Sequence, residues 1–248
     1  MKVVYHEDFN QAYSSDPAAA HGRIEAVVKV IRDRVTFVEA TPAREEDITH
    51  VHTKSHTERV VREGVYDIAA LAAGGAIQAA RIGLEEPCFA LIRPPGHHAS
   101  AGSSWGFCYF NNMAIALEKL KREGRIKSAF ILDFDLHFGD GTVNILGGQG
   151  YVSIYNPSAS DRHAYLEGVR ERLFSERVDI IGVSAGFDNH IEDWGGLLTT
   201  ADYREMGGLV RQASEKSSGG CFAILEGGYN HQVLGQNVLA FLEGLGGA

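Results

Sequence analysis

The chain of 248 residues has few cysteines and no long apolar run. Its three cysteines, Cys88, Cys108 and Cys221, form no Cys-x-x-Cys motif, which argues against a disulfide framework or a structural zinc knuckle. No apolar stretch reaches the length of about 18 residues that a membrane-spanning helix needs. Residues 1–5 open directly into a strand-like run without an apolar leader. We therefore expect a soluble cytoplasmic protein that does not bind membranes.

Positively charged residues are also in the minority. Lys and Arg number 23 against 32 Asp and Glu, which gives a net charge of −9. This balance argues against a nucleic-acid-binding surface, because phosphate backbones are bound by clustered Lys and Arg. The shares of hydrophobic residues (44%) and charged residues (22%) are those of an ordinary globular protein.

The sequence has only 6 prolines, and we find no Pro/Ser-rich linker, internal repeat or low-complexity segment. Apolar β-like runs alternate with helical patterns instead. We expect strands at residues 2–6, 35–40, 88–93, 128–135, 151–155, 178–186 and 221–228, and helices at 23–33, within 43–83, and at 111–124, 165–176, 201–216 and 231–244. Strands that are apolar throughout and followed by helices predict a mostly parallel central sheet with helices on both faces. We expect a single α/β domain over residues 1–248.

Polar residues gather directly after four of the expected strands. The four segments read RPPGHHASAGSSWGFCYFNN, LHFGDGT, FDNHIEDWGG and YNH. In open parallel sheets, ligands bind at the carboxyl ends of the strands. The shared position of these segments therefore predicts one site.

Asp135 and His137 are candidate metal ligands. Residues two apart in an extended segment point the same way, so these two side chains face a common point. Aspartate with histidine is half of a ligand set for zinc or another divalent first-row metal. Asp188 is the candidate third ligand, and three protein ligands leave a position open for water. The alternative is a buried, hydrogen-bonded Asp–His pair without a metal.

His97 and His98 follow a loop that two prolines and a glycine make rigid. Adjacent imidazoles held in this way suit proton transfer next to a metal. Each ring needs an orienting partner, and Asp133 and Asp140 are the acids left over near the metal candidates. The alternative is a pair of partly exposed loop histidines.

Tyr229 and Phe107 each stand beside glycine. Tyr229 follows two glycines at a strand end, where a phenol can donate to a developing oxyanion. Phe107, next to Gly106, can form the wall of an apolar slot. For both residues, packing is the alternative.

Together these stretches resemble the histone deacetylase and acetylpolyamine amidohydrolase superfamily. RPPGHHA, GFCYFNNMAIA, DFDLHFGDGT, VSAGFD, GGLLTTADY and LEGGYN occur in the family's order across roughly residues 65–235. The resemblance is closest to class II-type and bacterial members. It implies an arginase-like α/β fold.

The resemblance also implies roles for individual residues. The resemblance implies that zinc is bound by Asp135, His137 and Asp188, and this donor set also tolerates iron(II). The implied catalytic residues are His97 and His98 with their partners Asp133 and Asp140, and Tyr229, which polarises the scissile carbonyl.

Two further groups are implied in the same way. The expected substrate contacts are Gly106, Phe107 and Gly228, with Phe107 as an aromatic wall. A structural potassium ion is expected against Asp133, Asp135, His137, Ser153 and Ile154.

The implied function is zinc-dependent hydrolysis of an amide, which removes an acyl group such as acetyl from a small-molecule or peptide amine. Acetyl-lysine and acetylated polyamines both fit. One alternative is an arginase-like dimanganese ureohydrolase that recruits Asp133, His190 and Asp193 beside the three candidate ligands, but it leaves His97, His98 and Tyr229 without a role. The other is a non-catalytic relative that binds acyl-amines.

The sequence departs from the family around the rim of the site. Residues 156–177 form a shorter connection than in relatives, so the second aromatic wall has no clear counterpart, and Tyr155 is a poor candidate for it. Phe138 stands where relatives often have a histidine, and the acid that grips the substrate backbone has no match. We expect a more open site, or a rim completed by a second subunit in a homo-oligomer.

Overall fold

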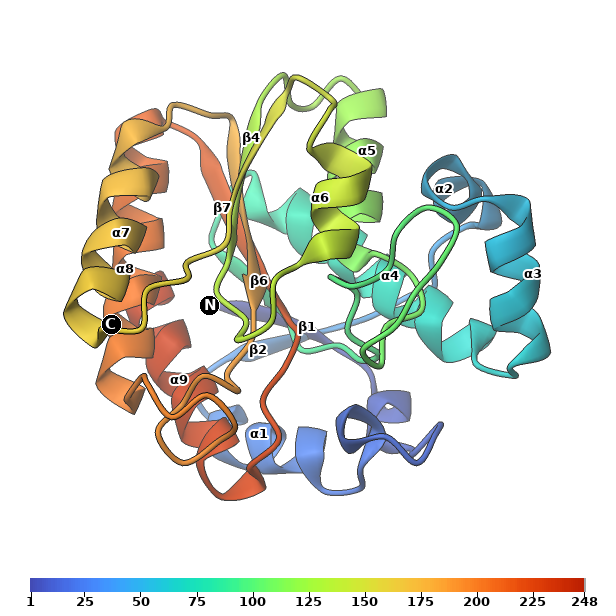
Figure 1. Ribbon diagram of the computed structural model, residues 1–248, viewed down its shortest axis with the longest axis horizontal. Helices are drawn as coiled ribbons and strands as arrows, with labels where there is room; N and C mark the ends of the chain where they lie inside the picture. The colour runs from blue at the N-terminus through green and yellow to red at the C-terminus, as the bar shows by residue number, and fades with distance from the viewer. Residues whose placement is uncertain (248) are drawn as a thin grey trace.

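The computed structural model describes residues 1–247. Its centre is a seven-stranded parallel sheet with the strand order β2-β1-β3-β7-β6-β4-β5 (Figure 1). The strands are β1 (Lys2–Tyr5), β2 (Thr36–Glu39), β3 (Cys88–Ala90), β4 (Ala129–Asp133), β5 (Val152–Tyr155), β6 (Ile180–Ala185) and β7 (Gly220–Leu225). Each expected strand is present, which confirms the parallel sheet predicted from the sequence.

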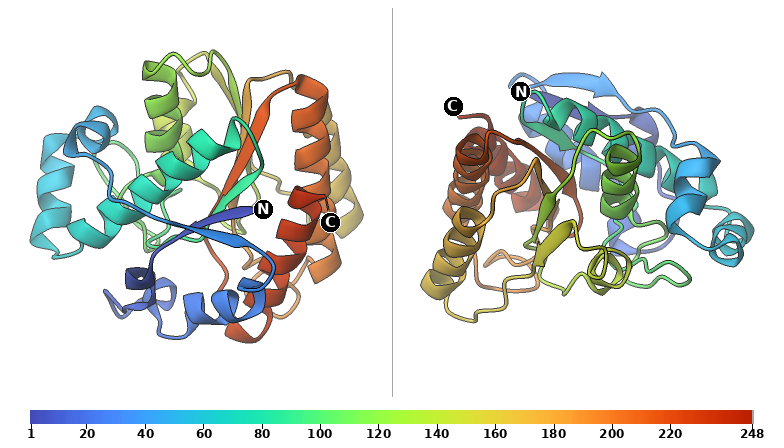
Figure 2. Two further views of the ribbon diagram at one scale, coloured as in Figure 1. Left: turned by 180° about the vertical axis from the view of Figure 1, so that it is seen from behind. Right: turned by 90° about the horizontal axis from the view of Figure 1, so that it is seen from above.

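Helices cover both faces of this sheet, and Figure 2 shows the two layers on opposite sides. One layer holds α4 (Tyr66–Gly83), which packs on β1, β3 and β7, with α5 (Asn112–Arg122) beside it and α6 (Asp140–Leu146) against α5. The other layer holds α1 (Arg23–Ile31), α7 (Arg162–Ser175), α8 (Thr200–Ser217) and α9 (His231–Gly246). The short helices α2 (Glu45–Val51) and α3 (Lys54–Arg62) extend the α4–α5 layer at its outer end (Figure 1).

The apolar strands lie where two-sided burial requires them. Every residue of β3, β4 and β6 is buried, because helices cover both faces of a parallel sheet. The edge strand β2 is short and exposes Thr36 and Glu39 at its ends, and polar residues there discourage pairing with another chain. Within residues 1–247, no helix combines the length and apolar character needed to cross a membrane.

Helix ends follow the local sequence signals. The Asn111 side chain accepts a hydrogen bond from the Ala114 N–H and caps α5, while Gly124 adopts a φ of 68° just after the helix. Thr199 and Asp202 form a capping box at the start of α8. The sequence did not indicate α6, a short helix that begins at Asp140 inside a segment read as a polar loop.

Candidate active site

The sheet order places the four polar segments side by side. They follow β3, β7, β6 and β4, which are consecutive neighbours in the sheet. All four strands are parallel, so their carboxyl ends share one edge. Asp133 is the last residue of β4, and Asp188 and Tyr229 follow β6 and β7.

A buried aromatic cluster fixes the two strand ends that carry the metal candidates. Phe134 lies between Asp133 and Asp135, and Phe187 precedes Asp188, so the apolar and acidic side chains alternate. The Phe134 ring is 5.8 Å from that of Phe187 and 5.4 Å from that of Phe241 on α9. This packing leaves the carboxylates to face the opposite way.

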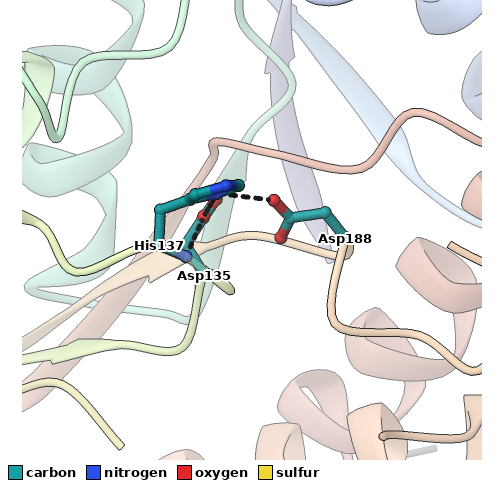
Figure 3. Close-up of side chains that lie close together, drawn as sticks. All are labelled: Asp135, His137 and Asp188. Carbon is teal, nitrogen blue, oxygen red and sulfur yellow. Dashed lines mark hydrogen bonds and ion pairs between the residues drawn. The ribbon is translucent and has the colours of Figure 1, made fainter. Parts of the chain in front are cut away.

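Asp135, His137 and Asp188 come together as the sequence predicted (Figure 3). Each offers one potential ligand atom, and these atoms lie within 4.8 Å of one another. The Nδ1 atom of His137 is 3.2 Å from Asp135 Oδ1 and 3.1 Å from Asp188 Oδ2. Both aspartates are buried, whereas the His137 ring is partly exposed.

The electrostatics of this triad fit a divalent cation. Asp188 Oδ2 is buried and accepts no hydrogen bond within residues 1–247, although His137 Nδ1 lies close to it. Burial and the negative charge of Asp135 raise the pKa of Asp188, as expected for two carboxylates that share a dry site. A metal ion bound by this triad would satisfy the orphaned oxygen and neutralise the paired charge. Two carboxylates with one imidazole are donors that suit zinc or iron(II).

Each of the tandem histidines has the carboxylate partner expected from the sequence. His97 Nδ1 is 3.1 Å from Asp133 Oδ2, and His98 Nδ1 is 2.7 Å from Asp140 Oδ1. Both histidines are buried, and their ring centroids are 4.0 Å apart. A carboxylate on Nδ1 leaves Nε2 of each ring to act on a substrate or water.

The two rings differ in their affinity for a proton. Burial opposes protonation of His97, but the carboxylates of Asp135 and Asp133 outweigh it and hold the pKa of His97 well above its usual value. Burial and the neighbouring charge of His97 lower the pKa of His98 to about 4. The surroundings of the two rings therefore favour protonation to different degrees.

Phe107 and Tyr229 face each other, with their ring centroids 5.9 Å apart. Gly106 and Phe107 both have left-handed backbones, with φ values of 59° and 67°. This conformation is uncommon for phenylalanine and is found where the surrounding structure enforces it. A Cβ atom on Gly106 would come within 2.4 Å of His98 Cδ2, so the glycine allows the loop to pack against the His98 ring.

These groups surround a cavity of 120 Å³. Its walls are Pro95, His97, His98, Trp105, Gly106, Phe107, His137, Trp194, Gly227 and Tyr229. Gly228, expected to contact the substrate, is not among the lining residues, and its carbonyl accepts a hydrogen bond from Arg23. The cavity opens onto His137 and both tandem histidines.

Sequence reasoning missed two buried residues that hold the loops of the site. The Oε2 atom of Glu226 accepts hydrogen bonds from the N–H groups of Gly96 and His97, at 2.7 and 3.2 Å. The fully buried Arg23 donates to the carbonyls of Gly228 and Glu226, at 2.8 and 2.6 Å. Glu226 directly follows β7, so its place at a strand end was an available signal, whereas Arg23 is more than 200 residues away from its partners.

The two tryptophans were also missed. Trp105 and Trp194 line the cavity, and each ring is about half exposed. They occupy the outer side of the site, where the sequence left the second aromatic wall unplaced. Both lie within the polar segments that follow strands, which was the signal available.

The further ligands of a two-metal site are not brought together. Asp193 accepts hydrogen bonds from the backbone N–H groups of Tyr229 and Asn230, and His190 Nδ1 accepts one from Glu192. In the described part of the chain, the triad of Asp135, His137 and Asp188 is the one group whose atoms could hold a metal. This geometry favours one metal over two.

The expected potassium contacts remain a prediction. Ser153 and Ile154 lie in β5 and pair with Phe130 and Ile131 of β4. Ser153 and Ile154 therefore lie one strand away from β4, which ends at Asp133 and is followed by Asp135.

Comparisons with known proteins agree with this arrangement. The sequence profile of the Histone deacetylase domain matches residues 35–165 and 148–245. A protein of Archaeoglobus fulgidus named "probable deacetylase" is 32% identical, over 92% of this chain and 81% of its own. A "histone deacetylase-like amidohydrolase" of Pseudomonas aeruginosa is 27% identical, over 86% of this chain and 71% of its own. The crystal structure of the HDA15 HD domain superposes with a TM-score of 0.84 at 24% identity, covering 99% of this chain and 89% of that one. This likeness confirms the fold that the sequence implied.

Proposed function

The chain belongs to the histone deacetylase family, and on that premise we propose that it is a zinc-dependent hydrolase that removes an acyl group, such as acetyl, from an amine. The observation that carries the proposal is the convergence of three features on one cavity. These are the Asp135–His137–Asp188 triad, the two histidine–aspartate pairs, and the phenol of Tyr229.

Asp135, His137 and Asp188 would hold the metal. Bound there, zinc supplies a Lewis acid that polarises the amide carbonyl and lowers the pKa of water. Iron(II) suits the same donors. Metal analysis of the protein purified from its own cells would show which of the two metals it carries.

The tandem histidines move protons. One of the two rings accepts a proton from the water whose oxygen forms the new bond to the amide carbon. His98 then delivers this proton, passed on from His97 where that ring accepted it, to the amine nitrogen as the carbon–nitrogen bond breaks. The products are a carboxylic acid and a free amine, so the atoms of one water are divided between them. Asp133 and Asp140 keep the Nδ1 atoms occupied throughout, which fixes the orientation of both rings.

Tyr229 stabilises the charge that develops on the carbonyl oxygen. Burial and the negative charge of Asp135 raise the pKa of Tyr229, so the phenol stays protonated and can donate. Its hydroxyl donates to no atom of residues 1–247, which leaves it available for the oxyanion.

The substrate is an acylated primary amine with a small acyl group. The cavity of 120 Å³ has room for an acetyl group. Acetyl-lysine in a peptide and acetylated polyamines both present such a group, and the family supports either.

Hydrolysis of an acetyl-lysine reporter peptide tests the proposal. The assay compares the purified protein, the protein after chelation, and the chelated protein with zinc restored, alongside acetylated polyamines and longer acyl chains. We expect activity that chelation removes and zinc restores. A zinc-loaded protein that hydrolyses none of these substrates would support the non-catalytic alternative.

A further inference from the structure

Two tryptophans are present in the chain, and each stacks on a different catalytic ring of the proposed function. Burial does not explain their positions, since Trp105 and Trp194 are 56% and 53% exposed. Each tryptophan ring instead covers a side chain, His98 or Tyr229, that must keep a defined orientation in the proposed reaction. The inference below rests on the proposed function, because it concerns the same residues.

Trp105 contacts both members of the His98–Asp140 pair. Its indole ring stacks on the His98 imidazole, with ring centroids 3.8 Å apart and a tilt of 30° between the ring planes. Its Nε1–H donates a hydrogen bond of 2.9 Å to Asp140 Oδ2, while Asp140 Oδ1 faces His98 Nδ1. Both carboxylate oxygens are therefore engaged, and the three side chains form a closed triangle. The carboxylate can rotate only if one of these two contacts breaks.

Trp194 has an equivalent relation to Tyr229. Its ring stacks on the phenol, with centroids 4.1 Å apart and planes at 27°. The preceding residue, Asp193, accepts hydrogen bonds from the backbone N–H groups of Tyr229 and Asn230, at 2.8 and 2.7 Å. The Asp193–Trp194 pair thus holds both the backbone and the ring of Tyr229.

We propose that Trp105 and Trp194 are positioning residues, Trp105 for the His98–Asp140 pair and Trp194 for the phenol of Tyr229. Catalytic groups lose efficiency when their geometry is off by a fraction of an ångström or a few degrees, so locked rings raise the rate of the chemical step. The effect belongs in kcat, because the groups that the indoles position act in the transition state and not in substrate binding.

Steady-state kinetics of four variants on zinc-loaded protein test this role. Trp105→Phe keeps a stacking ring but removes the N–H donor, and Trp105→Leu removes both. Trp194→Phe keeps the stack, and Trp194→Leu removes it. Val61→Ala is the matched control, because Val61 on α3 is exposed to a similar degree (54%) but is not a lining residue of the cavity.

We expect Trp105→Phe to lower kcat roughly tenfold, because the hydrogen bond to the charged Asp140 is lost. Trp105→Leu should lower kcat further. We expect Trp194→Phe to keep kcat within about twofold of the wild-type value and Trp194→Leu to lower it roughly tenfold. KM should change little in all four variants. A raised KM with unchanged kcat, or an equal loss of kcat in Val61→Ala, would show that the indoles only provide an apolar rim.

A nuclear magnetic resonance measurement tests the Trp105 contact without relying on turnover. The ¹⁵N-labelled protein gives two indole N–H signals, which the Trp→Phe variants assign. We expect the Trp105 proton to exchange with water more slowly than that of Trp194, whose Nε1 donates to no atom of residues 1–247. We also expect the Trp105 signal alone to move in Asp140→Ala.

The two measurements separate the possible failures. Equal exchange rates and an unmoved Trp105 signal would overturn the role of Trp105, even in an active enzyme. A protected indole in a protein that hydrolyses no acyl-amine would overturn the proposed function instead.

Discussion

Each proposed catalytic side chain is held by a neighbour, but the reacting hydroxyl of Tyr229 is left without a hydrogen-bond partner in residues 1–247. The His97 and His98 rings bind carboxylates through Nδ1, and Tyr229 is fixed through its backbone and ring face. This division is typical of a preorganised site, in which the reacting atoms stay free while the rest of each side chain is held by hydrogen bonds and packing.

Removing the hydroxyl of Tyr229 tests its role in the reaction. Tyr229→Phe keeps the ring that packs between Phe107 and Trp194, so substrate binding should stay nearly intact. We expect kcat to fall by about 100-fold or more, because loss of an oxyanion donor has effects of this size. Steady-state kinetics with acetyl-lysine substrate provide the measurement.

Tyr151→Phe is the control for this prediction. It removes a phenol hydroxyl at the opposite end of the sheet, just before β5, where the group donates to Glu118. An unchanged kcat in Tyr229→Phe would exclude the phenol as the oxyanion donor.

At the scale of elements, the strand ends could be predicted from the sequence because apolar runs and the polar residues after them are local signals. The stretch at 128–135 identifies β4 and the start of the site, and Asp135, His137 and Asp188 meet as expected. Helix α6 escaped notice because it is short and flanked by glycines. It matters for the site, since Asp140 is its first residue.

The contacts of Trp105, Trp194 and Arg23 could not be predicted in the same way. Each depends on how a loop folds back over a residue brought near by the sheet, and neither composition nor periodicity records such a contact. The left-handed backbone of Phe107 is another tertiary effect, because its sequence neighbours alone do not require it.

The contact between α2 and α5 makes a prediction about acid stability. Asp47 on α2 is buried and bonded to Lys119 and Arg122 of α5. Burial alone would raise the pKa of Asp47, but these two cations outweigh it and lower the pKa below its usual value. The stability that the ionised carboxylate contributes is therefore complete above the unfolded pKa of about 3.9 and is lost as the pH falls through the lower folded pKa.

Unfolding by urea at a series of pH values measures this contribution. We expect Asp47→Asn to reduce the free energy of unfolding by about 2 kcal/mol at neutral pH, and the difference from the wild type to shrink below about pH 4. Asp33→Asn, at an exposed position, removes the same charge and should have little effect. A deficit of Asp47→Asn that is independent of pH would contradict the assignment to the ion pairs.

At the scale of the whole molecule, the order of strands in the sheet brings the separate polar segments together into one site. Segments that follow β3, β4, β6 and β7 are far apart along the chain, and only the arrangement β3-β7-β6-β4 makes their ends neighbours. The site is assembled by the fold, and within residues 1–247 it holds one group of three side chains that could bind a metal, which fits a one-metal hydrolase better than a two-metal ureohydrolase.

The most direct test of this account is the recovery of activity as metal-free protein is titrated with zinc, with bound zinc measured in the same samples. We predict that hydrolysis of acetyl-lysine peptide rises in proportion to zinc up to one equivalent per chain and then stays constant, and that Asp188→Asn neither retains zinc nor recovers activity. Full activity without metal, or activity that rises until two equivalents are bound, would contradict the account.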